Sequence, residues 1–248
     1  MDIGPKFVII SDLHLGMKDG SPKKVLRFLD SFVCDTLILN GDIIDIDAIK
    51  RGSKWKNKHT KVVTKLIEMS KFMNIIYVRG NHDDDIKELY NFKIGNIKIV
   101  DELIIEASDK KYLVFHGDKI DVTVKYKFLT QIGSIGYDIS LRINTWYNKY
   151  RTYIGKPYFS ISKVIKEKFK SAIKFVMDFE SNACDYAKTK KCDGVICGHI
   201  HIPTIKNING IEYLNSGDWV ENFSYLYLDN DGNWKLDYFT SSTHETSE

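Results

Sequence analysis

Short apolar runs, each followed by acidic, amide or histidine side chains, are the main pattern along the chain. The first run is Phe-Val-Ile-Ile-Ser at residues 7–11, and its unbroken apolar character predicts a strand buried on both faces. Runs of the same kind predict buried strands at 36–40, 75–78, 112–115 and 193–197. Helical segments separate the early strands, so the pattern indicates an α/β fold.

The other elements are predicted from spacing and turn signals. Apolar residues at helical spacing predict helices near 22–32, 59–72 and 162–188. Short strands of a second sheet are expected at 97–100 and 103–106. Alternating segments around the turn signals Asn209-Gly210 and Asp231-Gly232 predict late strands at 204–208, 211–214, 223–228 and 234–239.

Polar side chains of the same few types follow five of the apolar runs. They are Asp12 and His14, Asp42 and Asp45, Asn81 to Asp83, His116 and Asp118, and His199 and His201. Ligands of α/β sheets gather at the carboxyl ends of strands. Any one of these ends is also explained as a turn or a helix cap, because Asp, Asn and Gly are turn formers. Five unrelated turns would not also hold five of the seven histidines of the chain, so we expect one site.

Seven of these side chains form a mixed set of oxygen and imidazole ligands. The candidate metal ligands are Asp12, His14, Asp42, Asn81, His116, His199 and His201. Divalent cations accept such sets, and seven ligands with one bridging carboxylate are too many for one ion and suit two. Two ions ~3.5–4 Å apart lower the pKa of a bridging water, which attacks as hydroxide, and hold phosphoryl oxygens in line. We expect two Mn²⁺ ions, with Fe or Zn as alternatives that this ligand set also accepts.

The order and spacing of these stretches resemble the signature of the calcineurin-like metallophosphoesterases. The matching motifs are Asp12-x-His14, Gly41-Asp42-x-x-Asp45, Gly80-Asn81-His82-Asp83, His116-Gly117-Asp118 and Gly198-His199-x-His201. The resemblance implies an α/β (α+β) fold, a four-layer sandwich of two mixed β-sheets flanked by helices. It also implies a metal-dependent enzyme that hydrolyses a phosphoester or pyrophosphate bond.

The resemblance further implies separate roles for the residues. One metal would be held by Asp12, His14, Asp42 and His201, and the other by Asp42, Asn81, His116 and His199. His82 would protonate the leaving group or stabilise the transition state, oriented by Asp83. Asp45 and Asp118 are expected to accept hydrogen bonds from ligand histidines, since a metal-bound histidine usually donates its other N–H to an acceptor.

A narrower resemblance is to the UDP-2,3-diacylglucosamine diphosphatase-like branch of that family. It rests on Trp55 and His59, on residues 155–158 and on residues 213–221. That branch includes lipid A enzymes of Gram-negative bacteria, which cleave the pyrophosphate between a uridine nucleotide and a diacylated sugar phosphate, giving UMP. The characterised lipid A enzymes carry Arg where this chain has His82. This departure leaves the reaction class unchanged and keeps a phosphodiesterase, phosphatase or nuclease as an alternative.

The charge distribution adds a second feature. Between Lys119 and Lys174 there are 12 basic residues and three acids, so this segment carries +9, and the rest of the +3 chain carries −6. A basic segment suggests an anionic partner such as a lipid, although a solvated helix face explains it too. We expect a core at 1–118 and 192–239, a helical cap insertion at 119–191 and a polar tail at 240–248.

Weaker candidates and the setting complete the interpretation. Arg79, Trp55 and His59 are candidate substrate contacts. An outward-facing Arg79 explains the sequence equally well, and a histidine on a helix, such as His59, is more often structural or exposed. The four cysteines lack Cys-x-x-Cys spacing, and neither a signal peptide nor an apolar run of about 20 residues is predicted. We therefore expect a cytoplasmic protein that acts on a phosphorylated small molecule or lipid, with peripheral contact at the cytoplasmic face of the inner membrane. A nucleic acid partner is not favoured, a non-catalytic binding module would lack ligands that this chain has, and no oligomeric state is predicted.

Overall fold

The computed structural model describes residues 4–18, 20–90, 95–120, 150–151, 153–155 and 161–240. Its internal contacts divide the chain into two units. The core unit consists of residues 1–120 and 182–248, and the insertion unit consists of residues 121–181. The two units are described separately below.

The first sheet of the core unit has six strands, in the order β11-β10-β1-β2-β3-β4. Four strands run parallel, namely β1 (Phe7–Ile10), β2 (Thr36–Asn40), β3 (Asn74–Val78) and β4 (Ile97–Val100). The antiparallel strands β10 (Ser224–Leu228) and β11 (Trp234–Tyr238) extend the sheet beyond β1. The expectation that 97–100 belongs to the second sheet is therefore wrong. Ile97 and Ile99 pack into the core of the first sheet, and Ile75 pairs with Ile97.

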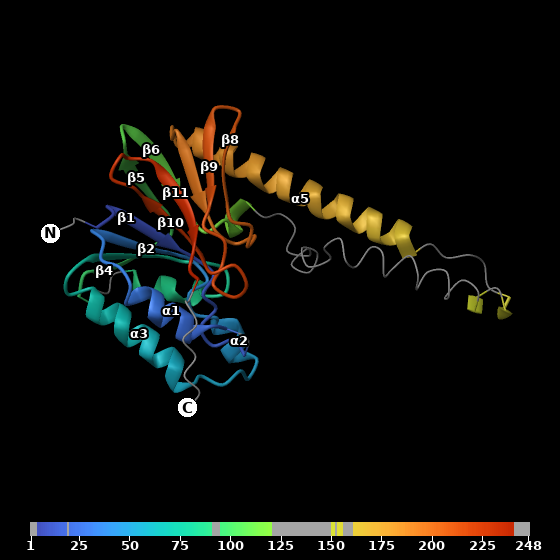
Figure 1. Ribbon diagram of the computed structural model, residues 1–248, viewed down its shortest axis with the longest axis horizontal. Coiled ribbons are helices and arrows are strands. Elements are labelled where there is room, and N and C mark those ends of the chain that lie inside the picture. Colours follow the sequence, from blue (N-terminus) through green and yellow to red (C-terminus); the bar gives the residue numbers. More distant parts are fainter. Residues whose placement is uncertain are drawn as a thin grey trace. The chain divides into compact units, whose positions relative to one another are not determined.

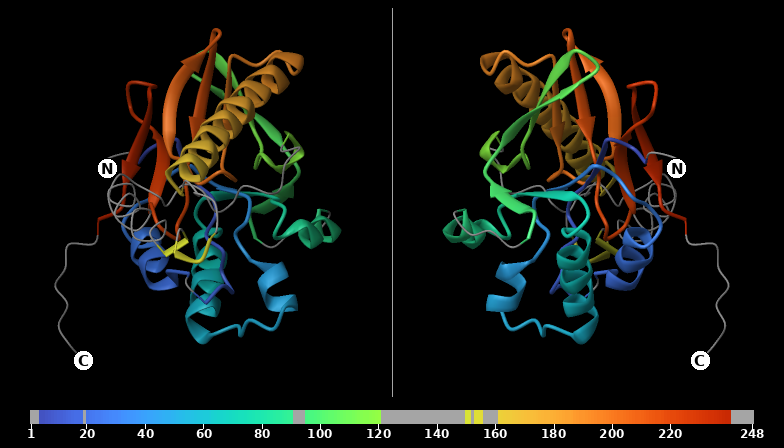
Figure 2. Two further views of the ribbon diagram at one scale, coloured as in Figure 1. Left: turned by 90° about the vertical axis from the view of Figure 1, so that its right-hand side faces the viewer. Right: turned by 90° about the vertical axis from the view of Figure 1, so that its left-hand side faces the viewer.

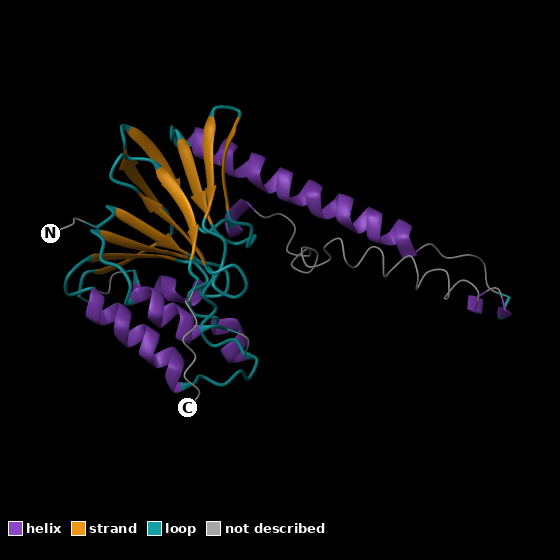
Figure 3. Cartoon of the chain, viewed as in Figure 1, coloured by secondary structure: helices purple, strands orange, loops and turns teal. Residues whose placement is uncertain are grey.

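The second sheet has five strands, in the order β5-β6-β7-β9-β8 (Figures 1 and 3). The parallel strands at its centre are β6 (Lys110–Val114), β7 (Gly194–Cys197) and β9 (Ile211–Asn215). The antiparallel edge strands are β5 (Leu103–Ala107) and β8 (Thr204–Ile208). Asn209 and Gly210 both have positive φ at the β8–β9 turn, as a tight hairpin of this type requires. The two sheets are both mixed, as predicted.

Helices α1 (Pro22–Leu29) and α3 (Asn57–Met69) pack on the first sheet through a shared apolar cluster. Further short elements are the helix α2 (Ile46–Lys50) and the 3-10 turns η1 (Asp84–Leu89) and η2 (Asp118–Ile120). The helices α1 and α3 lie together on one side of the sheet (Figure 2). The first helix ends three residues earlier than predicted, and α2 was not predicted because five residues are too short to show helical periodicity.

Two apolar clusters form the interior of the core unit. One lies between the first sheet and its helices and includes Val25, Phe28 and Leu66. The other joins side chains of both sheets, for example Ile9 and Ile196, so the sheets pack face to face. The predicted long helix is α5 (Ile161–Thr189), and its last turns contact the second sheet through the rings of Tyr186 and Phe115. Among the described residues, no helix is both long enough and apolar enough to cross a bilayer.

Candidate metal centre

The predicted ligand residues all follow the carboxyl ends of strands, and the structure brings these ends together from both sheets. Asp12 and His14 follow β1, Asp42 follows β2, Asn81 follows β3, His116 follows β6, and His199 and His201 follow β7. Backbone hydrogen bonds join neighbouring ends, with Asp12 N donating to Gly41 O at 3.0 Å and Gly198 N donating to His116 O at 2.9 Å. Two parallel sets of strands therefore deliver one cluster of side chains.

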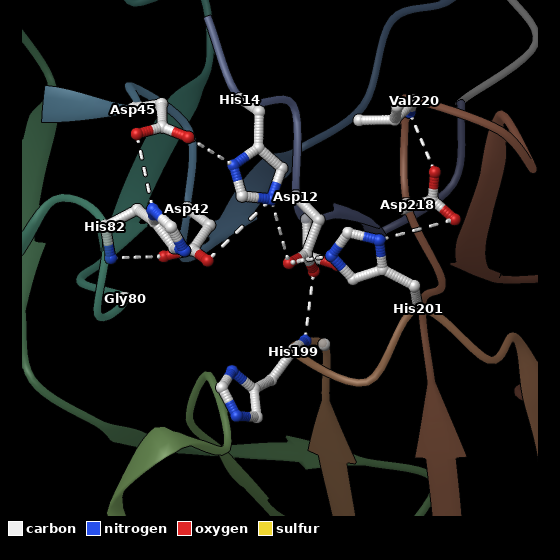
Figure 4. Close-up of polar contacts among 12 residues, drawn as sticks. Asp12, His14, Asp42, Asp45, Gly80, His82, His199, His201, Asp218 and Val220 are labelled. Carbon is white, nitrogen blue, oxygen red and sulfur yellow. Dashed lines mark hydrogen bonds and ion pairs between the residues drawn. The ribbon is translucent and has the colours of Figure 1, made fainter. Parts of the chain in front are cut away.

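A first group of ligand atoms consists of Asp12, His14 and His201. The Asp12 Oδ1 atom lies 3.0 Å from His201 Nε2 and 3.7 Å from His14 Nε2. One ligand atom from each of the three residues lies within 4.8 Å of the other two. Figure 4 shows both imidazoles turned toward the Asp12 carboxylate.

A second group consists of Asp42, His116 and His199, whose ligand atoms also lie within 4.8 Å of one another. The Asp42 Oδ2 atom is 3.3 Å from His116 Nε2 and 3.8 Å from His14 Nε2. Asp42 therefore lies between the two groups, in the position of a bridging carboxylate.

Buried polar atoms without a hydrogen bond gather at this place. Within the described parts of the chain, such atoms include Asp12 Oδ1, Asp42 Oδ2, Asn81 Oδ1 and His116 Nε2. A buried polar atom left without a hydrogen bond costs about 1–3 kcal/mol, so proteins rarely collect them. Three oxygens and one imidazole nitrogen form a donor set that divalent cations accept. The residues present therefore fit the metal ions that the motif implies.

The backbone at the site adopts an uncommon conformation. Asp12, His14, Asp42, His199 and His201 have φ angles of 54°, 45°, 52°, 67° and 57°. Side chains with a Cβ rarely occupy this left-handed region, and such strain gathers at functional sites. Five of the seven predicted ligands are thus fixed in strained conformations that the surrounding fold maintains.

Three motif glycines allow close approach to the ligand residues. A Cβ on Gly80 would lie 2.3 Å from Asp42 Oδ1, and a Cβ on Gly198 would lie 2.6 Å from Asp12 Oδ2. A Cβ on Gly41 would meet the His116 ring at 2.4 Å. Each motif glycine therefore makes room for a neighbouring ligand.

Charge in the site is shared between carboxylates and imidazoles. Burial alone would raise the pKa of Asp12 and Asp42, but the neighbouring histidines bring both well below the usual range. Burial would lower the pKa of His14, yet the carboxylates of Asp12, Asp45 and Asp42 raise it to about 9. The pKa of His116 rises to about 10 because Asp42 and Asp12 outweigh its burial. Without metal ions, both imidazoles carry protons at neutral pH.

Asp45 lies between two histidines. Its Oδ2 is 3.1 Å from His14 Nδ1, and its Oδ1 is 3.2 Å from His82 Nδ1 (Figure 4). Oδ1 also accepts a hydrogen bond from Ala48 N at 2.6 Å, so Asp45 caps α2 as well. Asp45 thus orients a candidate metal-ligand histidine and the candidate catalytic histidine together.

The structure differs from the expectation that Asp83 orients His82. Asp83 accepts hydrogen bonds from Gly80 N at 2.6 Å, Ile43 N at 2.8 Å and Tyr77 Oη at 2.6 Å. Both of its carboxylate oxygens are used, and it is fully buried. Asp83 therefore fixes the loop that carries Asn81 and His82, while the carboxylate Oδ1 of Asp45 lies within hydrogen-bond distance of His82 Nδ1, at 3.2 Å.

The acceptors behind the other histidines were not all predicted. His116 Nδ1 lies 2.9 Å from the Asn40 carbonyl oxygen, while the predicted acceptor Asp118 binds Arg79 at 2.8 Å. Asp218 Oδ2 lies 4.0 Å from His201 Nδ1, which is too far for a hydrogen bond. Asp218 Oδ1 accepts a hydrogen bond from Val220 N at 2.8 Å, so Asp218 holds the turn beside His201. A main-chain carbonyl has no sequence signal, whereas Asp218 stands in the 213–221 stretch that the sequence singled out.

The three candidate substrate contacts have partners of their own. Arg79 is paired with acidic side chains, among them Asp101 at 2.6 Å. Trp55 Nε1 donates to Thr60 Oγ1 at 2.8 Å, and its ring meets the His59 ring edge-on. His59 is 1% exposed, and its Nδ1 accepts from Lys56 N at 3.3 Å, so it caps the start of α3.

The fold and this site define a class of protein. The chain belongs to the calcineurin-like phosphoesterase family, whose sequence pattern matches residues 5–203, and it is a metal-dependent hydrolase. The predicted family, fold class and enzyme class are thereby confirmed.

Two curated relatives resemble almost the whole chain. A UDP-2,3-diacylglucosamine hydrolase of Shewanella sp. (strain ANA-3) is 25% identical over 238 residues, which cover 91% of this chain and 94% of the relative. A UDP-2,3-diacylglucosamine hydrolase of Neisseria meningitidis serogroup B (strain MC58) is 26% identical over 235 residues, which cover 90% and 94%.

Solved structures with similar folds include phosphoesterases. A novel archaeal phosphodiesterase has a TM-score of 0.47 and 16% identity, and the match covers 94% of this chain and 99% of that one. The phosphoesterase YfcE from E. coli gives the same TM-score, identity and coverage.

Proposed function

We propose that the chain is a two-metal pyrophosphohydrolase that acts on UDP-2,3-diacylglucosamine or a related nucleotide-linked lipid or sugar. Its products are UMP and a lipid or sugar phosphate. The observation that carries this proposal is the likeness to two UDP-2,3-diacylglucosamine hydrolases over 90–91% of the chain. The insertion unit, residues 121–181, is much longer than the tenth of the chain that these matches leave uncovered. The likeness therefore includes part of the insertion.

The site residues have distinct roles in this proposal. Asp12, His14 and His201 hold one ion, while Asn81, His116 and His199 hold the other, with Asp42 between them. The bound ions, Mn²⁺ in this proposal, supply a water of lowered pKa and positive charge for the phosphoryl oxygens. His82 donates a proton to the leaving group or stabilises charge in the transition state, and Asp45 orients its ring, which lies 3.2 Å away.

The insertion supplies the lipid contact in this proposal. Its residues Tyr150, Tyr153, Ile154, Ile173 and Met177 are large, apolar and exposed. The stretch from Lys119 to Lys174 has 12 basic residues and three acids, which favours an anionic lipid surface. We therefore place the enzyme in the cytoplasm, in peripheral contact with the inner membrane.

A second candidate function is hydrolysis of another phosphodiester or phosphomonoester by the same metal centre. His82 favours it, because the sequence departs at this position from the motif of the lipid A branch that it resembles. The proposed metal roles are the same for both candidates.

UMP release distinguishes the two functions. Purified protein with Mn²⁺ is expected to release UMP from UDP-2,3-diacylglucosamine. Turnover of a cyclic nucleotide or nucleic acid without UMP release would reject the lipid substrate and keep the metal chemistry. The control variant Asp42→Ala is expected to lose all activity because it removes the bridging carboxylate, and full activity in this variant would overturn the two-metal assignment.

A further inference from the structure

The side chain of Arg79 is held by carboxylates. Its Nε atom lies 2.6 Å from Asp101 Oδ1 and 3.4 Å from Asp84 Oδ1, and its Nη1 atom lies 2.8 Å from Asp118 Oδ2. The side chain is 14% exposed. The pKa of Arg79 is raised further above its usual value, because Asp118 and Asp101 outweigh the effect of burial. The positive charge is therefore neutralised within the core unit.

The pair between Arg79 and Asp118 joins two loops of the metal centre. Arg79 stands two residues before Asn81, on the loop after β3 of the first sheet. Asp118 stands two residues after His116, on the loop after β6 of the second sheet. Asn81 and His116 are the ligands assigned to the same metal ion. One ion pair thus spans the two sheets beside this ligand pair.

A wider network restrains the carboxylates around Arg79. Lys119 Nζ binds Asp101 Oδ2 at 2.5 Å and Glu102 Oε2 at 2.8 Å. Glu102 also binds Lys190 Nζ at 2.6 Å. Burial would raise the pKa of Glu102, but hydrogen bonds from Lys119, Lys190 and Tyr186 lower it to about 2. Asp101 is therefore shared between Arg79 and Lys119.

We propose that Arg79 is a positioning residue for the second metal subsite, acting through Asp118, and this inference rests on the proposed two-metal function. By tying the loop of Asn81 to the loop of His116, the ion pair fixes the spacing of two ligands that come from different sheets. A role as a phosphate contact fits less well. An incoming phosphate would have to compete with three carboxylates within 3.4 Å of the guanidinium.

Mn²⁺ binding measured by calorimetry tests this role. Arg79→Gln and Asp118→Asn are each expected to weaken one of the two Mn²⁺ sites by about 10–100-fold and leave the other unchanged, as loss of a group behind a metal ligand does. Arg79→Lys keeps the charge but loses the two-point geometry, so its effect should be intermediate. The matched control Lys110→Gln breaks the 3.3 Å pair with Glu212 at the start of β6 and should bind Mn²⁺ as the parent does.

Two results would overturn the inference. One is parental Mn²⁺ affinity at both sites in Arg79→Gln and Asp118→Asn. The other is a raised KM in Arg79→Gln alone with unchanged Mn²⁺ affinity, which would make Arg79 a substrate contact. If circular dichroism shows that Arg79→Gln does not fold, the Mn²⁺ affinity of the isosteric variant Asp118→Asn decides between the two results. Absence of UMP release by the parent protein rejects the proposed substrate and leaves the Mn²⁺ comparison intact, so the two failures are distinguishable.

Discussion

A single carboxylate, Asp45, contacts two histidines that have different roles in the proposed reaction. His14 is a candidate metal ligand, and His82 is the candidate proton donor. Replacing His82 and replacing Asp45 should therefore have different consequences.

The first prediction concerns His82 and Asp45. His82→Gln is expected to lower kcat by about 10²–10⁴-fold, the usual contribution of a general acid, with Mn²⁺ affinity unchanged. Asp45→Asn is expected to lower both kcat and Mn²⁺ affinity, since Asp45 also lies 3.1 Å from His14 Nδ1. Steady-state kinetics and calorimetry on both variants check this. A loss of Mn²⁺ affinity in His82→Gln would contradict the assigned role.

The second prediction concerns the pH dependence of the metal-free protein. The pKa of His14 rises from 6.5 to about 9, and that of His116 rises to about 10. These two histidines thus bind protons more tightly in the folded state than in the unfolded state, and their protonation stabilises the fold. This stabilisation is complete below pH 6.5 and is lost as the pH rises through 9 and 10. In urea unfolding of chelator-treated protein, the urea concentration at the midpoint should decrease as the pH is raised from 6.5 to about 10.

The same imidazoles must lose their protons to bind metal, so Mn²⁺ affinity should rise over this pH range. Calorimetry in buffers of different ionisation enthalpy should show proton release on Mn²⁺ binding. A midpoint that rises with pH in the metal-free protein, or binding without proton release, would contradict these pKa shifts.

At the scale of elements, the loops that end the strands carry the site. The Gly198 loop shows how closely they pack, since a Cβ there would lie 2.6 Å from Asp12 Oδ2. That oxygen also accepts a hydrogen bond from His199 N at 3.0 Å. The loop after β7 therefore fixes the position of the candidate ligand Asp12, which follows β1.

The third prediction tests this packing. Gly198→Ala should displace Asp12 and lower Mn²⁺ affinity by about tenfold or more, an effect comparable to losing a supporting group. Gly210→Ala is the control, because no atom lies within 4 Å of its added Cβ, although its φ of 85° makes the substitution locally strained. It should lower the thermal midpoint without changing Mn²⁺ affinity. Equal Mn²⁺ affinities in the two variants would contradict the close-approach argument.

The elements differ in how well their sequences predict them. The strands at 36–40, 97–100 and 204–208 have the predicted bounds, because buried apolar runs and turn signals are local features. The sheet to which 97–100 belongs was mispredicted, since strand pairing depends on tertiary contacts.

The candidate site shows the same division between local and tertiary information. The structure brings together six of the side chains that follow the predicted strands, namely Asp12, His14, Asp42, His116, His199 and His201. The choice between Asp45 and Asp83 as the partner of His82 depended on where each loop turns, which the sequence pattern does not specify. The Asn40 carbonyl behind His116 could not be predicted, because every residue has a main-chain carbonyl.

At the scale of the whole molecule, Glu102 contacts residues of the core unit that come before and after the insertion in the sequence. Lys119 precedes the insertion unit, while Tyr186 and Lys190 follow it, and all three contact the Glu102 carboxylate within 2.8 Å. These contacts lower the pKa of Glu102 from 4.5 to about 2, despite its burial.

The fourth prediction follows from that pKa. A carboxylate with a lowered pKa stabilises the fold above pH 4.5, and this stabilisation is lost as the pH falls toward 2. Glu102→Gln should therefore lower the thermal midpoint at pH 7 by about 2–4 °C, the shift that about 1 kcal/mol produces in a domain of this size. The decrease in thermal midpoint caused by Glu102→Gln should be smaller at pH 3 than at pH 7. Glu106→Gln, at an exposed residue, is the control, and an equal shift at both pH values would contradict the assignment.

The contacts of Glu102 with residues from both sides of the insertion have an evolutionary consequence. A segment whose flanking residues are held together within the core can change in length and content at small cost in loop-closure entropy. The register of β6 and β7, the strands on either side of it, need not change with it. Descendants of one ancestral chain can therefore exchange the insertion and keep the strands that carry the candidate metal ligands.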